Sequence, residues 1–467
     1  MRRFAARAAL ASSLLGAAAL TFDPPSRTAA RGLGRFARAA FTAAACALDT
    51  RVSSKAGADS PAAQAELDAR NAARVLSLCS ALGGVYVKLA QFSSAHPALR
   101  PSLAAPLSAL QDRAPPRPLA ALEGLLREEL RGAPLDSVFA AVEPTAIAAA
   151  SIAQVHRAWL RDGTAVALKI QYPELRASAA ADLASLRALF SVAAWLYEDL
   201  HYLLEMLPEF EATMRAELSF TQEARNAERV RAMAAGDPRF HVPAMHAALS
   251  TDRLLVQDFV EGETLARALR EGGLLDGAPA HVKRALAATV TDFFAQQLFV
   301  DGFVHCDPHP GNIMLRRRPG GGGFDMFFID WGMVRRLSPR FRRAHCDLWA
   351  ALLSRDARAT SAATAALGLH EGDADALSLM LTFRRAAGGG ALGSALTTEQ
   401  IEAMRADYKH VTAADFQAFA LRLPRDLFFV MRTAALVRGV NKQLGGSSRE
   451  RFVSWGAGAL RGARLSR

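Results

Sequence analysis

The sequence predicts an α+β protein of two lobes, a small antiparallel-sheet lobe and a mostly helical lobe, preceded by a helical extension. Residues 151–172 predict two strands joined by Asp162-Gly163, a dipeptide typical of tight hairpin turns. Residues 63–89, and most of the chain after Thr264, place apolar side chains at helical spacing. One further hairpin, within residues 300–334, interrupts the second helical region.

Composition describes an ordinary globular chain with a basic balance. The 467 residues allow two or three domains or one large bilobal domain, and 51% of them are hydrophobic against 22% charged. A formal net charge of +11 favours an anionic partner, for which nucleic acid, a phosphate ligand and an anionic membrane surface all qualify. We expect a nucleotide and a peripheral contact with an anionic membrane, and no nucleic acid. Four separated cysteines without C-x-x-C argue against a disulfide framework or zinc site.

Residues 1–31 predict an organelle leader, because they are rich in Arg and Ala and contain one acid, Asp23. A secretory signal is the rival interpretation, since residues 8–22 are uncharged after a basic start, but cysteine is scarce and arginines continue beyond them. We expect a mitochondrial leader, with a plastid leader as the alternative. The apolar run of residues 8–22 is short for spanning a bilayer, and no other stretch of sufficient length lacks charges, so we expect membrane association to be peripheral.

The hairpin within residues 300–334 carries the strongest chemical signal. Asp307 and Asn312 have the spacing of a kinase catalytic loop, in which the Asp receives a hydroxyl proton and the Asn holds magnesium. Asp330-Trp331-Gly332 ends a second apolar strand, where kinases carry D-F-G with a magnesium-binding Asp. The basic, Gly-rich residues 316–323 predict the turn between them. For either motif alone, the alternative is that Asp and Asn merely form a turn. The presence of both motifs, in the order found in kinases, favours the catalytic interpretation.

Lys169 ends Val-Ala-Leu-Lys on the second predicted strand, which matches V-A-I-K, whose Lys pairs with the nucleotide phosphates and a helix Glu. A lysine on an apolar strand needs an anionic partner if it is buried, and snorkelling to solvent is the alternative. The loop before the first strand has no glycine where kinases have G-x-G-x-x-G. It should be stiffer over the phosphates, and its residues are Ala148, Ala149, Ala150 and Ser151.

These motifs resemble the UbiB family, the aarF-domain-containing atypical kinases, and therefore a protein kinase-like fold. The resemblance rests on the catalytic loop at residues 305–312, the Ala-rich loop, and Lys88-Leu89-Ala90-Gln91, which is similar to the family's K-x-G-Q extension. Residues 110–116 are similar to its L-Q-D-x-x-P-P segment. The resemblance implies that Lys88 and Gln91 reach the nucleotide, although Ala90 replaces the family's Gly; a solvated helix face is the alternative for Lys88.

Residues 217–228 resemble the family's E-x-D-F/Y-x-x-E-A-x-N-A-E helix, within a predicted helix at 204–233. The resemblance implies that Glu223 pairs with the strand lysine and that Glu217 is the first acid of E-x-D. Ser219 stands where the family has the second acid of E-x-D, so any role that needs both acids is in doubt. For Glu217 the alternative is an ordinary glutamate on the helix surface. Gln257 and Phe259 lie where a kinase hinge holds the adenine edge through its backbone.

The resemblance covers residues 32–446, and residues 303–307 are most similar to a mitochondrial subgroup of the family. We expect five parts: a leader (1–31), a helical extension (32–136), a kinase-like N-lobe (137–262), a C-lobe (263–446) and a basic, mobile tail (447–467).

The expected function is that of an atypical kinase or ATPase that binds Mg-ATP or Mg-ADP. No A-P-E motif follows Asp330, and Cys306 replaces the Arg of the kinase H-R-D motif. We therefore expect that the surface on which protein kinases bind peptide substrates is missing. The family implies a role in mitochondrial quinone or lipid homeostasis, with lipid- or quinone-pathway proteins as partners. A nucleotide-binding regulator without turnover is one alternative. A small-molecule phosphotransferase is another, against which Lys88 and Gln91 argue. We expect Lys88→Ala to change nucleotide preference with little effect on folding.

Overall fold

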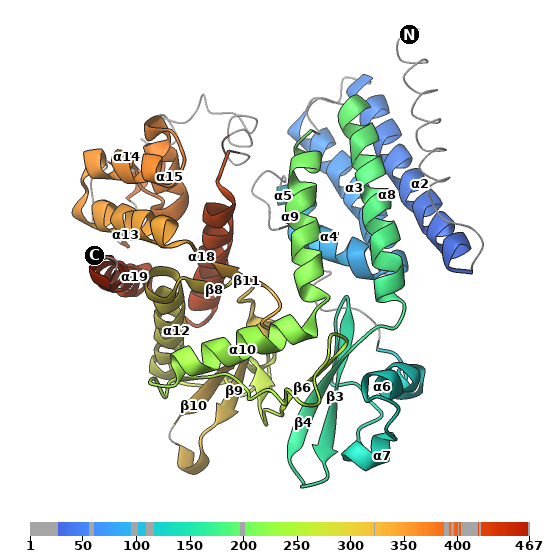
Figure 1. Cartoon of the computed structure of the whole chain (residues 1–467). Coiled ribbons are helices and arrows are strands. Elements are labelled where there is room, and N and C mark those ends of the chain that lie inside the picture. The colour runs from blue at the N-terminus through green and yellow to red at the C-terminus, as the bar shows by residue number, and fades with distance from the viewer. Residues whose placement is uncertain are drawn as a thin grey trace. The chain divides into compact units, whose positions relative to one another are not determined.

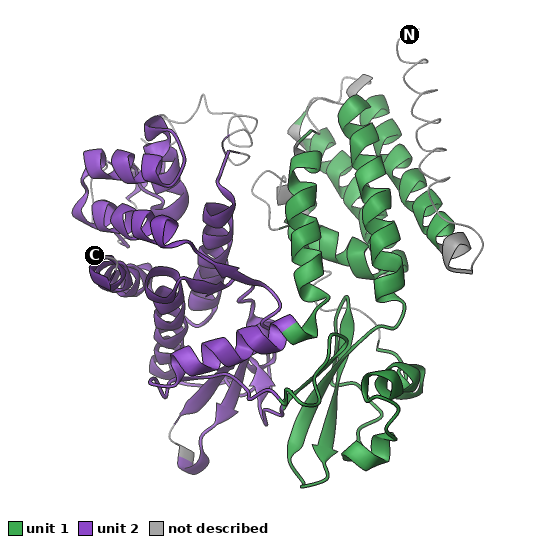
Figure 2. Ribbon diagram, in the orientation of Figure 1, with its two compact units in different colours: residues 1–221, 246–257 green, residues 222–245, 258–467 purple. Residues whose placement is uncertain are grey.

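The structure is a computed structural model that describes most of the chain. The described residues are 27–55, 60–94, 101–108, 116–196, 201–321, 323–386, 392–393, 397–399, 401–402, 419 and 422–465. The chain divides into two compact units, which Figure 2 colours separately: unit 1 is residues 1–221 and 246–257, and unit 2 is residues 222–245 and 258–467. The expected five-part division stays a prediction, and its leader lies outside the described residues up to residue 26.

Unit 1 contains a helical bundle, in which α2, α3, α8 and α9 lie side by side (Figure 1). Helix α4 crosses it and contacts α3, α8 and α9. A partly buried ion pair, 2.6 Å between Arg35 and Asp182, joins α2 to α8. The bounds of these helices are α2 (Arg27–Lys55), α3 (Pro61–Leu82), α4 (Gly84–Ser94), α5 (Pro101–Ser108), α8 (Leu175–Leu196) and α9 (Tyr202–Glu217).

The antiparallel sheet predicted for the small lobe is confirmed in unit 1. Its order is β1-β3-β4-β6, with β2 paired to β3. The predicted turn at Asp162-Gly163 is present: Gly163 has a φ of +87°, and the Thr164 amide donates to the Asp162 carboxylate at 2.9 Å. The strands are β1 (Phe139–Val142), β2 (Ala148–Ala149), β3 (Ala153–Leu160), β4 (Ala165–Gln171) and β6 (Leu254–Asp258), accompanied by η2 (Leu119–Ala121), α6 (Glu123–Glu129) and α7 (Leu135–Val138).

The helix predicted at residues 204–233 is two helices, so this prediction is wrong in part. Helix α9 ends at Glu217 and α10 (Phe220–Ala234) begins three residues later. The Ser219 hydroxyl, between them, donates to Asp252 at 2.9 Å, and the Phe220 amide donates to the Asp252 carbonyl at 3.2 Å. Partners from a distant segment thus replace helical hydrogen bonds at the break, which the local pattern of apolar residues could not indicate.

Unit 2 contains the predicted second hairpin, β9 (Ile313–Arg317) and β10 (Phe324–Phe328), joined through η6 (Pro319–Gly321). It forms a four-stranded sheet in the order β5-β10-β9-β7, with β5 (Phe240–His241) and β7 (Glu263–Thr264). A Cβ at Gly262 would lie 2.3 Å from the Leu315 carbonyl oxygen, so only glycine allows β7 to approach β9 so closely. Strands β8 (Phe303–His305) and β11 (Val334–Arg336) form a separate antiparallel pair.

The rest of unit 2 is mostly helical, as predicted. Helix α12 continues into a π-helical turn, η4, which ends at Gly302 in the left-handed conformation just before β8. The elements are α11 (Leu265–Ala268), α12 (Ala280–Ala295), η4 (Gln296–Asp301), η5 (Pro310–Asn312), α13 (Pro339–Ser354), α14 (Ala357–Ala366), η7 (Glu371–Asp373), α15 (Ala374–Thr382), α18 (Arg425–Gln443) and α19 (Ser448–Leu465).

The tail expected to be mobile is instead helix α19, which corrects that prediction. Arg449, Arg461 and Arg464 are exposed, while Phe452 and Trp455 are buried against α13. The Trp455 ring lies 5.2 Å from the Trp349 ring in an edge-to-face arrangement. The net positive charge suggested a solvated tail, but the apolar residues at helical spacing decided the structure.

Helix α8 is, among the described residues, long and apolar enough to cross a membrane by length and composition. The helix contains Arg176, Asp182 and Arg187, so it is not an uncharged stretch, and the expected peripheral membrane association stays a prediction. Core helices of soluble proteins pass the same test. The Arg35–Asp182 ion pair places a charge of α8 against α2.

Candidate active site

The hairpin of unit 2 brings Asp307, Asn312 and Asp330 together. Ile313 pairs with Phe328 in the register of β9 and β10, so the residues just beyond that pair become neighbours. The Ile329 amide donates to the Asn312 carbonyl at 3.0 Å, and the Asn312 side-chain amide donates to the Asp307 carbonyl at 3.0 Å. The pairing of the two strands therefore brings the two motifs, which are separate in the sequence, into one cluster.

His305 lies at the centre of this cluster and is 1% exposed. Its Nδ1 accepts from the Asp307 amide at 3.0 Å, so the proton is on Nε2, which faces the Ile329 carbonyl at 3.4 Å. Burial lowers the pKa of His305, while the carboxylates of Asp307 and Asp330 raise it. Both carboxylates therefore lie near one imidazole, and the neutral His305 holds the loop that carries Asp307.

Asp330 adopts a φ of +61°, a left-handed conformation that is uncommon outside glycine and that Asp tolerates better than most residues. Its Oδ1 accepts from the Gly332 amide at 3.3 Å. Between them, Trp331 is 1% exposed; its indole donates to the Phe328 carbonyl at 3.1 Å, and its own carbonyl accepts from Asn226 at 2.9 Å. Trp331 therefore anchors the turn that presents the Asp330 carboxylate.

Asn312 and Asp330 fit a magnesium ion. The Asn312 NH₂ group is used by the Asp307 carbonyl, so its Oδ1 is oriented away from that bond. Oxygen ligands from one carboxylate and one amide are what magnesium takes in phosphoryl-transfer sites, where phosphates and water complete the shell. The described residues hold no cluster of three or more His, Cys, Asp or Glu side chains that could bind a metal alone.

Arg432 is a residue of this site that the sequence analysis missed. From α18, its guanidinium donates to the Asp307 carboxylate at 2.9 Å, and the two side chains are 8% and 18% exposed. The Arg432 Nε is buried without a hydrogen-bond partner. Its neighbour Thr433 donates to the His305 carbonyl at 3.4 Å, so α18 holds the catalytic loop at two points. An arginine in a helix resembles a surface arginine in sequence, and no local signal distinguishes it.

In unit 1, the structure places Lys169 on β4, opposite Val155 of β3. Its ammonium group lies 5.1 Å from the centre of the Phe220 ring, which is a cation–π contact. Ala148 and Ala149 form the short strand β2 against β3, and Ala150 and Ser151 follow in the turn to β3. Gln257 lies in β6, whose end leads to Phe259.

Glu223 lies in the first turn of α10 and is 3% exposed. It belongs to unit 2, whereas Lys169 belongs to unit 1. The predicted pairing of Glu223 with Lys169 therefore stays a prediction. Gln257 of unit 1 and Phe259 of unit 2 likewise flank the boundary, and their role at an adenine ring also stays a prediction.

Lys88 and Glu217, both named by the resemblance, form a buried ion pair within unit 1. The Lys88 Nζ lies 2.6 Å from the Glu217 Oε1, and the side chains are 12% and 8% exposed. Lys88 comes from α4 and Glu217 from the last turn of α9, and Gln91 lies one turn after Lys88 on the same helix. The ion pair excludes the solvated-face interpretation of Lys88. It also changes the expectation for Lys88→Ala. The variant should lower stability, because it removes the cation that pairs with the buried Glu217 carboxylate.

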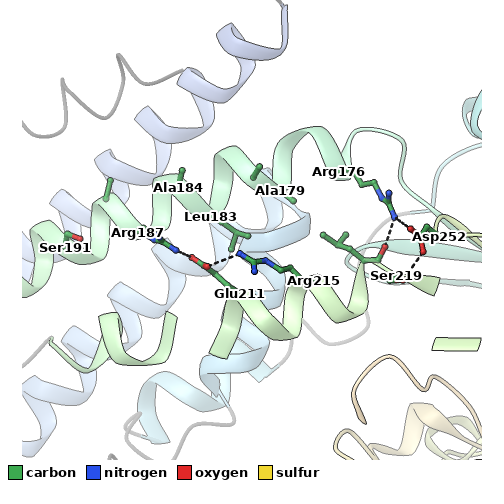
Figure 3. A pocket seen from close by; sticks show the side chains of 13 residues that line it. Arg176, Ala179, Leu183, Ala184, Arg187, Ser191, Glu211, Arg215, Ser219 and Asp252 are labelled. Atoms are coloured by element: carbon green, nitrogen blue, oxygen red, sulfur yellow. Dashed lines mark hydrogen bonds and ion pairs between the residues drawn. The ribbon is translucent and has the colours of Figure 1, made fainter. Parts of the chain in front are cut away.

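A groove of about 910 Å³ runs between α8 and α9 in unit 1 (Figure 3). Small side chains such as Ala180 and Ala184 line it on α8. Arg187 of α8 pairs with Glu211 of α9 across it, and Arg215, one turn further along α9, pairs with the same glutamate. None of the residues predicted for nucleotide or metal lines it. It is a separate feature from the catalytic hairpin.

Comparison with known proteins agrees with this geometry. Residues 109–364 match the family model described as the ABC1 atypical kinase-like domain. The chain is 31% identical over 392 residues to AarF domain-containing protein kinase 1 of Mus musculus, covering 82% of this chain and 72% of that protein. It is 30% identical over 386 residues to the Xenopus laevis protein of the same name, with the same two coverages.

Among solved structures, the chain is similar to that of Rv3197 from Mycobacterium tuberculosis, a complex with erythromycin. The TM-score is 0.51 at 24% sequence identity, covering 84% of this chain and 98% of that one. This likeness concerns the fold.

Proposed function

Because the chain belongs to the ABC1 atypical kinase-like family, the UbiB or aarF-domain family, we propose that it binds Mg-ATP or Mg-ADP and acts as an atypical kinase or ATPase. The observation that carries this proposal is the cluster of Asp307, Asn312 and Asp330 around His305. Magnesium, when bound, neutralises charge on the phosphate oxygens. Asn312 and Asp330 would hold it.

In this proposal Asp307 orients the attacking hydroxyl and receives its proton. The hydrogen bonds from Asn312 and to His305 fix the backbone of the loop, so the carboxylate needs little reorganisation. Lys169 and the loop at residues 148–151 would bind the phosphates, Gln257 and Phe259 the adenine edge, and Glu223 would orient Lys169.

A nucleotide-binding regulator without turnover is the second candidate, and one observation favours it. The Arg432 guanidinium donates to the Asp307 carboxylate at 2.9 Å, so it competes with a substrate hydroxyl for that carboxylate as a base. Nucleotide binding through Asn312 and Asp330 does not need this base. The two candidates therefore predict the same binding and different turnover.

Asp330→Asn tests the binding that both candidates share. Removing one formal charge from the metal ligands should abolish most of the magnesium-dependent rise in melting temperature that ATP or ADP gives the full-length wild type. Asp347→Asn, which changes an exposed carboxylate on α13, is the matched control and should keep that rise. An undiminished nucleotide effect in Asp330→Asn would refute the proposed site.

Turnover separates the two candidates. ATP hydrolysis and phosphoryl transfer are measured with purified wild type, Asp307→Asn and Asp330→Asn, with and without anionic liposomes. Turnover that both substitutions abolish supports the enzyme. Nucleotide binding with no turnover above the two variants supports the regulator.

We propose further that the protein works in mitochondria, at the surface of an anionic membrane, in quinone or lipid homeostasis. Family resemblance, the net charge of +11 and the Arg-rich residues 1–31 support this proposal. A fluorescent protein carrying residues 1–31 should enter mitochondria. Cytosolic retention would contradict the proposed location, and plastid import would replace it with the alternative.

A further inference from the structure

One face of α2 is apolar and exposed along most of the helix, which lies at the edge of the helical bundle of unit 1 (Figure 1). Six residues form this face, which we call the α2 stripe: Leu33, Ala37, Phe41, Ala44, Leu48 and Val52. The four large side chains are 47%, 76%, 64% and 57% exposed in chain order, and α2 exposes more large apolar side chains than any other helix of the described chain. The six residues are separated by 4, 4, 3, 4 and 4 positions, so they share one side of the helix.

The opposite side of α2 is packed against the bundle. Phe36 is 5% exposed. Near the start of the helix, Arg35 pairs with Asp182 of α8 at 2.6 Å, and near its end Asp49 pairs with Arg74 of α3 at 2.6 Å. The α2 stripe is therefore a second apolar face on a helix that is fixed at both ends through its first. A helix that is apolar on opposite sides is usually covered on both of them.

The α2 stripe is complementary to itself when two copies lie antiparallel. Its five intervals are the same when read from either end, so a two-fold axis between residues 42 and 43 places one stripe on the other. The facing pairs in this register are Phe41–Ala44, Ala37–Leu48 and Leu33–Val52. In the middle of the stripe each large side chain meets a small one, which is how facing helices interdigitate. A parallel pair would instead place Phe41 on Phe41 and Ala44 on Ala44, so that one level is crowded and the other is empty.

The charges beside the α2 stripe permit the antiparallel register. Arg38 and Arg51 flank the stripe, and in this register they lie opposite Ala47 and Gly34 of the second copy, so no cation faces a cation. The two copies of Arg38 are offset along the helices by roughly 14 Å. Insertion into a bilayer requires apolar area but makes no demand on the order of large and small side chains, so the symmetric order favours a second copy over a membrane.

We propose that the α2 stripe is the surface through which two copies of this chain form an antiparallel dimer. The stripe extends over residues 33–52, roughly 28 Å at the rise of an α-helix. Two such faces bury on the order of 1,000 Å², which is where the size range of specific interfaces begins. The contact is apolar and buries no charge. Because the interface is small, the dimer should dissociate reversibly on dilution.

Sedimentation velocity of the full-length chain over a range of concentrations tests the dimer. Wild type should change from monomer to dimer as the concentration rises. Phe41→Glu puts a charge into the centre of the stripe and should weaken dimerisation by about 30-fold or more, the effect of losing an interface hot spot. Val453→Glu, at an apolar residue of α19 that is 65% exposed, is the matched control and should dimerise as wild type does.

Two results would overturn the proposal: a wild type that is monomeric at every concentration, or a Phe41→Glu variant that dimerises as well as Val453→Glu. Ala44→Glu repeats the test at a second exposed position, and keeps it usable if Phe41→Glu fails to fold. It should weaken dimerisation in the same way, because Ala44 faces Phe41 across the axis.

Cysteine cross-linking tests the register. Residue 44 is offset from its own counterpart by three positions, roughly 4.5 Å along the helices, so Ala44→Cys should form an intermolecular disulfide under mild oxidation. Residue 52 is offset from its counterpart by roughly 28 Å. Val52→Cys alone should therefore not cross-link, whereas an equimolar mixture of Leu33→Cys and Val52→Cys should. Wild type, with its four native cysteines, gives the background. Cross-linking of Val52→Cys alone without cross-linking of Ala44→Cys would indicate a parallel pair and refute the antiparallel dimer.

Other occupants of the α2 stripe predict different results. A bilayer predicts a monomer in solution that sediments with vesicles of phosphatidylcholine and phosphatidic acid, and less sedimentation of Phe41→Glu than of Val453→Glu. Coverage by residues 1–26 of the same chain predicts a monomer in solution and no intermolecular disulfide in any variant. Either pattern would overturn the proposed dimer.

Discussion

Two buried ion pairs, Lys88–Glu217 in unit 1 and Arg432–Asp307 in unit 2, involve residues to which the family motifs assign a role at the nucleotide. In the first pair both partners belong to motifs. In the second, Asp307, the aspartate predicted to be catalytic, is paired with an arginine 125 residues away that belongs to none of the motifs. A motif therefore predicts which residues carry the chemistry. The charges that tune them must be found in the fold.

The largest effect is expected for Arg432→Met. Methionine keeps much of the side-chain length but leaves the Asp307 carboxylate, 18% exposed, without its cation. Unfolding free energy should fall by about 3–5 kcal/mol, the usual result of breaking a buried pair from one side. Urea denaturation measures this change. The double variant Arg432→Met/Asp307→Asn leaves no charge behind and should lose less than the single variant. A loss below about 1 kcal/mol in the single variant, the level of exposed pairs, would contradict a buried ion pair.

A smaller effect is expected for Lys88–Glu217, because Glu217 is the last residue of α9 and a double-mutant cycle measures only the coupling of the two side chains, not the cost of leaving one charge buried. A double-mutant cycle with Lys88→Met and Glu217→Gln should give a coupling energy of about 1–3 kcal/mol. The control is the same cycle on the Arg385–Asp375 pair, whose side chains are 45% and 36% exposed. There the coupling should stay below about 1 kcal/mol. Equal coupling in the two cycles would show that burial does not strengthen the Lys88 pair.

The pH dependence of stability distinguishes unit 2 from unit 1. His345 on α13 is fully buried, and burial lowers its pKa from 6.5 to about 3. Its Nε2 accepts from the Trp349 indole at 3.1 Å, so a proton there would face another donor. The folded His345 thus stays neutral while the unfolded one binds a proton. Stability is complete above pH 6.5 and should fall by about 1.4 kcal/mol per pH unit below it, down to about pH 3.

Denaturation curves between neutral and acidic pH measure this slope in wild type and His345→Gln. Glutamine keeps an acceptor for the Trp349 indole and is not protonated in this pH range. In His345→Gln the slope of stability against pH should therefore be smaller by about 1.4 kcal/mol per pH unit. An unchanged slope would assign the acid sensitivity to other groups, of which the buried His305 is the first candidate, because its pKa is also lowered.

The smallest effect is expected at Ser219, where the family motif has an acid. Asp252 accepts from the Ser219 hydroxyl at 2.9 Å and pairs with Arg176 at 3.1 Å, so a carboxylate already lies beside this position. Ser219→Asp should cost less than about 1 kcal/mol, because the repulsion is partly exposed and screened. The loss should shrink in high salt, and Ser219→Asn, without the charge, should show no salt dependence. Stabilisation by Ser219→Asp would mean that Asp252 does not occupy the place of the missing acid.

The sequence by itself determined the elements whose causes are local. Three signals depend on only a few neighbouring residues: a Gly with positive φ at a turn, alternating apolar residues, and the fixed spacing of Asp307 and Asn312. The two hairpins and the cluster at the end of the second hairpin were therefore predictable. Helical spacing predicted the extension and most of the second lobe for the same reason.

Only the tertiary structure decided which charges meet. Ser219 ends a helix because Asp252 accepts its hydroxyl, and the basic end of the chain becomes α19 because Trp455 finds Trp349. Arg432 and Arg438 lie two turns or less apart on α18, yet among the described residues one meets a carboxylate and the other does not. A charge on a helix has the same local sequence signal whether its face meets solvent, an aspartate or a second arginine. The packing of distant segments sets the dielectric and the partner, and hence the energy of that charge.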